Sequence, residues 1–190
     1  MYGSTEATSR MAYMPTNLNK KYPESIGIAI PGGTLWLQNK KKKKITSANA
    51  VGEIVYKGSN VCLGYSNSKK DLRKGDENKG ILLTGDLGII NKNKLLFIIG
   101  RKKRFLKVFG LRVNLDELET ILSDLGYNCV CSGIDNKLKI YFLKKFKKNY
   151  ADVIEKISNV TKINKSVFKI KLVDKFPRNQ SGKILYNKLN

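Results

Sequence analysis

Apolar and polar positions follow one pattern up to about residue 100 and another pattern beyond it. In the first part, short apolar or β-branched runs alternate with segments rich in Gly, Pro, Asn or Lys, which is typical of strands joined by turns. The expected strands are Ile26–Ile30, Thr34–Leu37, Gly52–Tyr56 and Leu95–Ile99. Two polar stretches, residues 39–49 and 71–80, are expected to be loops. This part therefore predicts a small β-rich barrel or sandwich.

The second part combines helix and strand patterns. Asn114 offers a helix N-cap, and apolar residues then recur at helical spacing until Gly126, which can end the helix. Ala151–Val160 has the pattern of a second amphipathic helix. Strand patterns occupy Phe105–Val108, Leu111–Val113, Tyr127–Ile134, Leu138–Leu143 and Val167–Val173. Phe176–Lys183 is expected to be a loop closed by a short terminal helix. Together, the helix and strand patterns of the two parts predict the α+β fold class.

The net charge of +22 comes from 37 Lys and Arg residues against 15 Asp and Glu residues. Only six of the 37 are Arg, and the lysines are scattered, with runs only at Lys40–Lys44 and Lys144–Lys148. A basic surface for nucleic acid is one interpretation. Lysine enrichment from an A/T-rich coding sequence, with the side chains solvated, is the other. The scatter and the shortage of Arg favour the second interpretation.

The sequence contains no His, which excludes a Ser–His or Cys–His nucleophile pair and a metal site built on His. Its three cysteines, Cys62, Cys129 and Cys131, follow no zinc-binding spacing and are expected to be free thiols. No apolar run approaches the roughly 20 residues of a membrane-spanning helix, and the first residues lack a signal-peptide core. A reducing, cytoplasmic location is therefore expected.

Two short motifs carry groups that suit a nucleotide. In Tyr2–Glu6, Gly3 would let the backbone approach a ligand, while a Thr hydroxyl and a Glu carboxylate would hold a phosphate oxygen and a magnesium ion. In Thr84–Asp86 the carboxylate can accept hydrogen bonds from both hydroxyls of a ribose, and Arg101 can add a guanidinium. Taken alone, each motif is equally typical of a capped turn or a surface side chain.

Two longer blocks are more specific, and with the short motifs they point to a family. In chain order the blocks are YGSTEA, VGEIVYKGSNVCLGY, LLTGD, GRKKRFLKVFGLRVNLDELE and PRNQSGKI. This order resembles the AMP-forming adenylating enzymes, a superfamily of acyl-CoA synthetases, luciferases and adenylation domains of peptide synthetases. The resemblance covers essentially all 190 residues and is strongest to the acyl-CoA synthetase or acyl-acid ligase types.

The resemblance implies that the chain is the C-terminal portion of such an enzyme. Residues 1–102 would be the C-terminal, β-rich and barrel-like part of the large AMP-binding domain. Residues 103–190 would be the small, mobile α+β domain. The upstream phosphate loop and acyl pocket of the family are not in this sequence. A truncated, split or mis-started gene is therefore expected. If the gene is split, the missing portion would be a separate partner chain.

The resemblance also assigns nucleotide-binding roles. Tyr2 would pack on adenine, Thr5 would touch the phosphate, and Glu6 would bind magnesium. Asp86 would hold the ribose hydroxyls, with Arg101 supporting that contact. Asn179, which stands where Thr is common in the family, can make similar turn bonds.

Three lysines carry the remaining roles that the resemblance implies. Lys183 would stabilise charge on the reacting phosphorus during adenylation. Lys103 matches the hinge residue, and rotation there would withdraw Lys183 and bring the hairpin with Lys107 and Gly110 to the site for thioester formation.

The expected function follows from these roles. ATP activates a carboxylic acid as an acyl-adenylate, AMP is the nucleotide product, and the acyl group passes to CoA or to the phosphopantetheine thiol of a carrier protein. A role in fatty acid metabolism is one setting for such a ligase. By itself the chain is expected to be inactive. The alternative is a non-enzymatic basic module that binds nucleic acid.

Overall fold

The computed structural model describes residues 1–144 and 150–189, so of the basic run at 144–148 only Lys144 is included. The chain divides into two compact units, Met1–Lys102 and Lys103–Asn190, here called the first and second units. Each unit has its own hydrophobic core and is described by itself. The α+β class expected from the sequence is confirmed.

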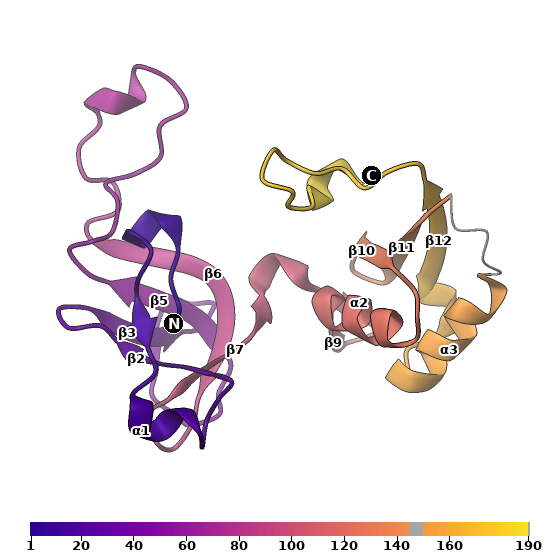
Figure 1. Ribbon diagram of the computed structural model, residues 1–190, viewed down its shortest axis with the longest axis horizontal. Coiled ribbons are helices and arrows are strands. Elements are labelled where there is room, and N and C mark those ends of the chain that lie inside the picture. Colours follow the sequence, from indigo (N-terminus) through magenta and orange to yellow (C-terminus); the bar gives the residue numbers. More distant parts are fainter. Residues whose placement is uncertain (145–149, 190) are drawn as a thin grey trace. The chain divides into compact units, whose positions relative to one another are not determined.

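The first unit is built on a curled antiparallel sheet of seven strands (Figure 1). Its strands, in spatial order, are β1 (Ala12–Tyr13), β2 (Ser25–Ala29), β7 (Leu96–Arg101), β6 (Ile81–Ile90), β5 (Gly52–Lys57), β3 (Thr34–Gln38) and β4 (Lys44–Ile45). A short helix, α1 (Thr16–Asn19), connects β1 to β2. The inner face of the sheet buries Leu37, Ile54, Tyr56, Leu82 and Leu96.

Strand β6 is the longest strand of the first unit, and the apolar pattern did not predict it. The reason is a bulge at its centre, where Val55 pairs with Leu83 but Glu53 already pairs with Leu87. Gly85 lies in this bulge with φ of +73°, a conformation that favours glycine. The bulge disturbs the strict alternation of side chains by which a strand is recognised in a sequence.

The second unit contains a hairpin, two helices and a three-stranded sheet. The hairpin joins β8 (Phe105–Val108) to β9 (Leu111–Asn114), and helix α2 (Leu115–Asp124) follows directly. The sheet has the order β10 (Cys129–Ile134), β11 (Lys137–Leu143), β12 (Phe168–Val173). Helix α3 (Ala151–Thr161) provides the connection between β11 and β12, which are parallel. No helix among the described residues is long and apolar enough to cross a membrane.

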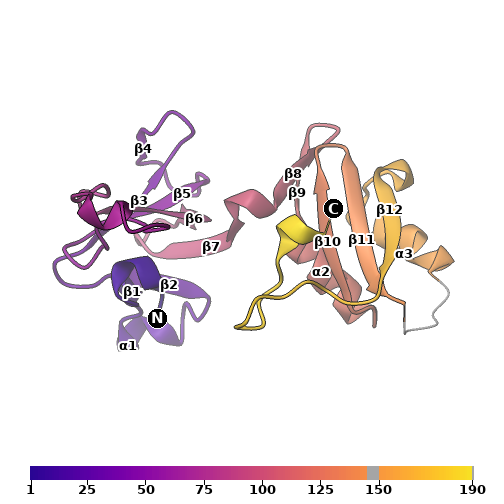
Figure 2. The ribbon, with the colours of Figure 1, turned by 90° about the horizontal axis from the view of Figure 1, so that it is seen from above.

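The two faces of this sheet are covered differently (Figure 2). Helices α2 and α3 pack on one face, where Leu118, Leu122 and Ile157 meet Ile140 and Phe142 of the central strand. On the other face, the segment after β12, residues 174–189, packs part of its apolar side chains against the strands. We call this stretch the terminal segment; it ends in a single 3-10 turn, Tyr186–Lys188, rather than in an α-helix.

Local sequence signals set the ends of helix α2 as expected. The side chain of Asn114 caps the helix by accepting a hydrogen bond from the backbone N–H of Asp116 at 3.0 Å. Gly126 follows the helix with φ of +82°. Strand β12 begins one residue later than expected, because residues 165–167 form a 3-10 turn.

Candidate functional site

The carboxylate of Asp86 lies at the centre of a polar cluster in the first unit. The bulge of β6 positions it: the backbone N–H of Asp86 donates to Thr84 Oγ1 at 3.1 Å, and the Thr84 hydroxyl donates to the carbonyl of Ile54 at 2.8 Å. Its Oδ2 accepts the Tyr2 hydroxyl at 2.6 Å, and its Oδ1 pairs with Nε of Arg101 at 2.8 Å. The structure therefore brings together three of the residues expected to bind a nucleotide.

Burial distinguishes the members of this cluster. Asp86 is only 6% exposed, whereas the side chain of Arg101 is largely exposed. Burial, reinforced by the hydrogen bond to Asp86, raises the pKa of the Tyr2 hydroxyl well above its ordinary value. Tyr2 therefore acts as a neutral hydrogen-bond donor to a fixed carboxylate, and Arg101 supplies the positive charge on the solvent side.

Glu6 lies in a 3-10 turn, Thr5–Ala7, close to the same cluster. Its pKa is lowered, first by a hydrogen bond from its own backbone N–H and then by the hydroxyl of Tyr65, which donates to Oε1 at 2.9 Å; the charge of Arg101 also contributes. Tyr65 was not among the residues singled out from the sequence, because it lies 59 positions away in a loop. Thr5 is exposed beside Glu6.

Gly3 is required by the packing of its own loop. A Cβ atom on Gly3 would lie 1.5 Å from the carbonyl oxygen of Ser9, and no side chain fits there. The close approach that glycine permits here is to the chain itself; a role of Gly3 toward a ligand stays a prediction.

The hairpin β8–β9 in the second unit carries Lys107, whose backbone N–H and carbonyl both bind the β10–β11 turn. The N–H of Lys107 donates to the Asp135 carboxylate at 2.7 Å, and its carbonyl accepts from the N–H of Asn136 at 2.8 Å. The hairpin turn consists of Phe109 and Gly110, both with positive φ. Lys107 is thus an exposed lysine on a fixed backbone.

Lys183 lies in a tight loop of the terminal segment that Asn179 organises. The Asn179 side chain accepts from the N–H of Lys183 and from the Ser181 hydroxyl, both at 2.9 Å, and the Asn179 N–H donates to the Lys183 carbonyl at 3.0 Å. These are the turn bonds that the sequence led us to expect of Asn179. The side chain of Lys183 is exposed.

Lys103 is exposed in a 3-10 turn, Lys102–Arg104, at the boundary between the two units. The residue before it is tied to the first unit, because the Lys102 amine binds the Glu53 carboxylate at 2.8 Å. The residue after it, Arg104, is tied to the second unit by its own side-chain contacts. The rotation assigned to Lys103 stays a prediction.

Arg104 is the main polar residue that sequence reasoning missed. It is 7% exposed, and its guanidinium pairs with Asp116 at 2.6 Å, pairs with Glu119, and donates to the carbonyl of Cys131 at 2.7 Å. The ring of Tyr186 stacks on the guanidinium, 3.8 Å from its centre. Burial acts to lower the pKa of Arg104, but the charges of Glu119 and Asp116 more than offset this and raise it. The network links the 3-10 turn Lys102–Arg104 to α2, β10 and the terminal segment.

No group of three His, Cys, Asp or Glu side chains within the described residues is placed to hold a metal ion. A magnesium ion at Glu6 would therefore take its other ligands from phosphate oxygens and water, as this ion often does. The three cysteines are free, and Cys131 is buried under helix α2.

Known proteins resemble this chain in sequence, although no protein-family model matches it. Luciferin 4-monooxygenase of Luciola mingrelica is 35% identical over 121 residues, which cover 64% of this chain and 22% of that protein. 4-Coumarate–CoA ligase 1 of Petroselinum crispum is 27% identical over 196 residues, which cover 97% of this chain and 36% of that protein. The chain thus spans between about a fifth and just over a third of the length of these relatives.

Solved structures share its fold. O-succinylbenzoate coenzyme A synthetase from Bacillus subtilis in complex with AMP superposes with a TM-score of 0.73 at 23% identity, covering 99% of this chain and 40% of that one. An anthranilate CoA ligase in complex with anthranoyl-AMP gives a TM-score of 0.68 at 22% identity, covering 98% of this chain and 38% of that one.

Proposed function

Because the chain matches the C-terminal portion of the AMP-forming adenylating enzymes, we propose that it acts within an ATP-dependent acid–thiol ligase. The first unit would contribute one wall of the nucleotide site, and the second unit would carry the two lysines that serve successive half-reactions. The relatives named above are ligases and a luciferase, which gives the alternative of a nucleic-acid-binding module no support.

The observation that carries this proposal is the environment of Asp86. A carboxylate offers about four acceptor positions, and Tyr2 and Arg101 occupy two of them. The remaining positions suit the two vicinal hydroxyls of a ribose. The Tyr2 ring, which borders both core clusters of the first unit, would present an aromatic surface to adenine.

In the first half-reaction a carboxylate oxygen would attack the α-phosphorus of ATP, and the bond to the bridging oxygen of pyrophosphate would break. Lys183 would stabilise the negative charge that builds on the phosphoryl oxygens. The Thr5 hydroxyl would contact the phosphate, and Glu6 would hold magnesium. The lowered pKa of Glu6 keeps this carboxylate ionised, as a magnesium ligand must be.

In the second half-reaction a thiol sulfur would attack the acyl carbon, and AMP would leave. We assign Lys107 to this step and the rotation between the two steps to Lys103. The two backbone hydrogen bonds of Lys107 attach the hairpin to the β10–β11 turn, so rotation would move the hairpin together with the sheet. CoA is the proposed acceptor, since the ligases among the relatives are named for it, and a carrier-protein thiol is the other acceptor.

An assay of pyrophosphate exchange tests the proposal. The chain would be combined with a polypeptide that supplies the phosphate loop and acyl pocket, and would be presented with ATP, magnesium and a panel of carboxylic acids. We expect exchange in the mixture, none from the chain alone, and loss of exchange with Lys183→Ala. Rapid exchange by residues 1–190 alone would contradict the proposed division of the enzyme. The assay does not address location, and a cytoplasmic location stays a prediction.

A further inference from the structure

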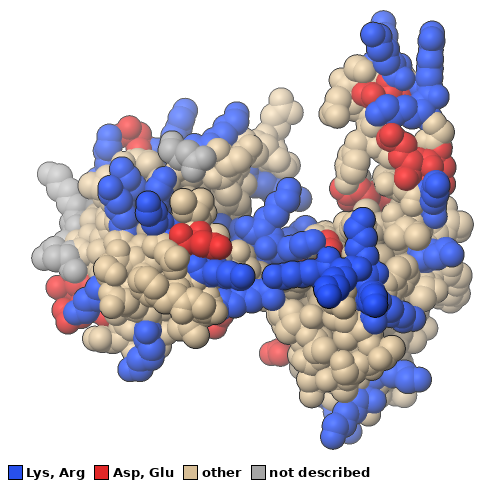
Figure 3. Space-filling model, turned by 180° about the vertical axis from the view of Figure 1, so that it is seen from behind, with Lys and Arg blue, Asp and Glu red and all other residues tan. Residues whose placement is uncertain are grey.

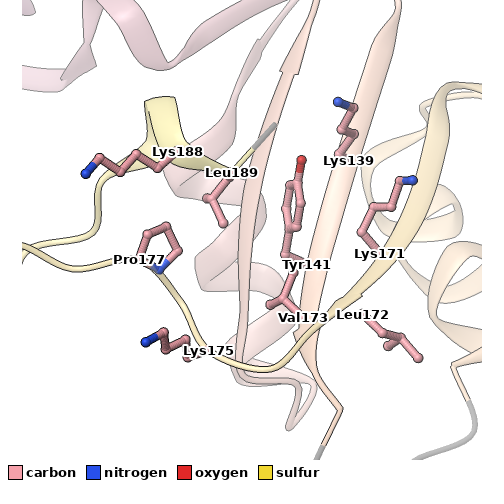
Figure 4. A pocket seen from close by; sticks show the side chains of 9 residues that line it. All are labelled: Lys139, Tyr141, Lys171, Leu172, Val173, Lys175, Pro177, Lys188 and Leu189. Atoms are coloured by element: carbon pink, nitrogen blue, oxygen red, sulfur yellow. The ribbon is translucent and has the colours of Figure 1, made fainter.

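The second unit has a pocket on the sheet face opposite its helices (Figure 4). The pocket has a volume of about 380 Å³ and lies between strands β11 and β12 on one side and the terminal segment on the other. Ligand sites for small molecules begin at about 300 Å³. None of the residues assigned to the nucleotide or to the two half-reactions lines it.

Lysine is enriched around this pocket. Four of its nine lining residues are Lys, namely Lys139, Lys171, Lys175 and Lys188, against 31 of 190 in the whole chain. No Asp or Glu is among the nine, and within the described part of the chain none of the four amines forms an ion pair. Compositional bias spreads Lys over both units (Figure 3), but it does not explain a more than twofold local enrichment in a lining that contains no Asp or Glu; the adjacent Asp174 pairs with Lys144.

The strand register makes this concentration of charge costly. Lys139 pairs directly with Lys169 across β11 and β12, and Lys171 is the next residue of β12 on that face. Like charges at directly opposite positions of a sheet repel each other. Lys169 itself does not line the pocket, but an anion bound beside Lys139 and Lys171 would offset part of the repulsion that Lys139 experiences.

The floor of the pocket is apolar and aromatic. Tyr141, Val173 and Leu189 belong to the small core beneath the terminal segment, and Pro177 adds to the lining. Figure 4 shows the phenol oxygen of Tyr141 and the amine of Lys139 directed toward the same end of the pocket. The Ser132 hydroxyl donates to the Tyr141 oxygen at 3.4 Å, which leaves the Tyr141 proton for a ligand.

We propose that this pocket binds a phosphorylated small organic molecule. The phosphate would lie between Lys139, Lys171 and the Tyr141 hydroxyl, which together supply charge-assisted hydrogen bonds. The organic part would cover Val173, Pro177 and Leu189. Lys175 and Lys188 lie on the rim formed by the terminal segment, and their flexible stems let the amines reach an anion there.

Phenyl phosphate is a suitable probe, because it combines a phosphate dianion with an apolar ring. Titration would be followed by backbone amide shifts at Ser132, Lys139, Tyr141 and Lys171 in NMR spectra of the full chain. We expect saturable shifts confined to these strands and the terminal segment, and at least tenfold weaker binding of inorganic phosphate, which lacks the ring.

A double variant, Lys139→Gln with Lys171→Gln, should weaken phenyl phosphate binding at least tenfold. The matched control, Lys40→Gln with Lys42→Gln, removes the same charge from an exposed loop of the first unit and should change binding less than twofold. Equal melting temperatures of both variants would exclude a loss through unfolding. Shifts that do not saturate, or equal losses in both variants, would overturn the proposal. Tighter binding of a DNA duplex at the same residues would also overturn it, in favour of a nucleic-acid surface.

Discussion

Glu6 and Tyr65 form a contact that only the folded chain creates, and after the backbone hydrogen bond of Glu6 it is the next cause of the lowered pKa of this proposed magnesium ligand. The hydroxyl of Tyr65 donates to the Glu6 carboxylate, which favours the ionised form. The same bond raises the pKa of Tyr65, because it favours the protonated phenol. The Glu6 pKa is lowered and the Tyr65 pKa is raised, as one hydrogen bond between an ionised carboxylate and a protonated phenol requires.

Replacing Tyr65 by Phe should raise the pKa of Glu6 toward its ordinary value, measured by carbon NMR of the Glu6 carboxyl during an acid titration. A carboxyl whose pKa is lowered in the folded state stabilises that state at pH values above its ordinary pKa. This stabilisation is lost as the pH falls through the lowered pKa of the folded state. The variant should therefore lose less stability on acidification than the parent does. Tyr13→Phe, at an exposed tyrosine, serves as the control. An unchanged Glu6 midpoint in Tyr65→Phe would show that the backbone hydrogen bond acts alone.

Phe109 is a second residue whose conformation the sequence did not indicate. It is 67% exposed and has φ of +46°, an unusual value for a bulky side chain. With Gly110 it forms a two-residue hairpin turn in which both residues have positive φ, and such turns favour Asn followed by Gly. The aromatic ring therefore stands on a backbone that it disfavours, at the tip of the hairpin that carries Lys107.

Phe109→Asn should stabilise the second unit by about 1 kcal/mol, because Asn tolerates the left-handed conformation. Urea denaturation would measure the gain. Phe109→Leu removes the ring but keeps the unfavourable backbone preference, so it should give no such gain. Equal stability of the Asn and Leu variants would contradict the strain assigned to this turn.

At the scale of elements, sequence patterns predict well what depends on neighbours along the chain. Helix α2 was predicted because its cap, its apolar spacing and its terminal glycine all lie within 13 residues. Strand β6 was missed because the bulge at Gly85 disturbs its alternation. Arg104 was missed because it stands in a run of basic residues, while its partners lie 12 to 82 positions away in α2, β10 and the terminal segment.

The Arg104 network provides a test of how the second unit is held together. Arg104→Met keeps the apolar stem but leaves Glu119 without its main charged partner, and burial already raises the pKa of that carboxyl. Removing one partner of a buried ion pair costs about 3–5 kcal/mol. We expect a loss of this size in the unfolding free energy of the second unit, read from hydrogen exchange in α2 and β10. Lys165→Met, which breaks the exposed pair with Glu155, should cost at most about 1 kcal/mol. Similar losses in the two variants would contradict the role given to Arg104.

At the scale of the whole molecule, each of the two compact units leaves part of its surface uncovered, and the absence of the upstream portion leads us to expect apolar surface on the first unit. The first unit exposes several large apolar side chains: Leu63, Tyr65, Leu72 and Leu83 are each more than half exposed. Such surface is expected if further parts of an enzyme cover it. The pocket of the second unit could not be predicted from the sequence, because its lysines come from two strands and the terminal segment.

The proposed division of labour between Lys183 and Lys107 is a property of the two units together. In the reconstituted enzyme, Lys183→Ala should slow formation of acyl-adenylate about a hundredfold or more, since loss of a preorganised charge-stabilising group typically has this effect. It should hardly change the transfer of a pre-made acyl-adenylate to a thiol. Lys107→Ala should have the opposite effect. Assaying each half-reaction separately measures both.

Lys103→Pro extends this test to the boundary between the units. Proline fixes φ near −65°, so it would restrict rotation at this residue without removing either catalytic lysine. If rotation at Lys103 presents one lysine at a time, the variant should retain one half-reaction and lose the other. The control is Lys103→Ala, which removes the same charge but leaves φ of this residue free, so it should retain both half-reactions. If Lys183→Ala and Lys107→Ala slowed both half-reactions equally, and Lys103→Pro matched Lys103→Ala, the two lysines would serve one fixed site and the alternation would be refuted.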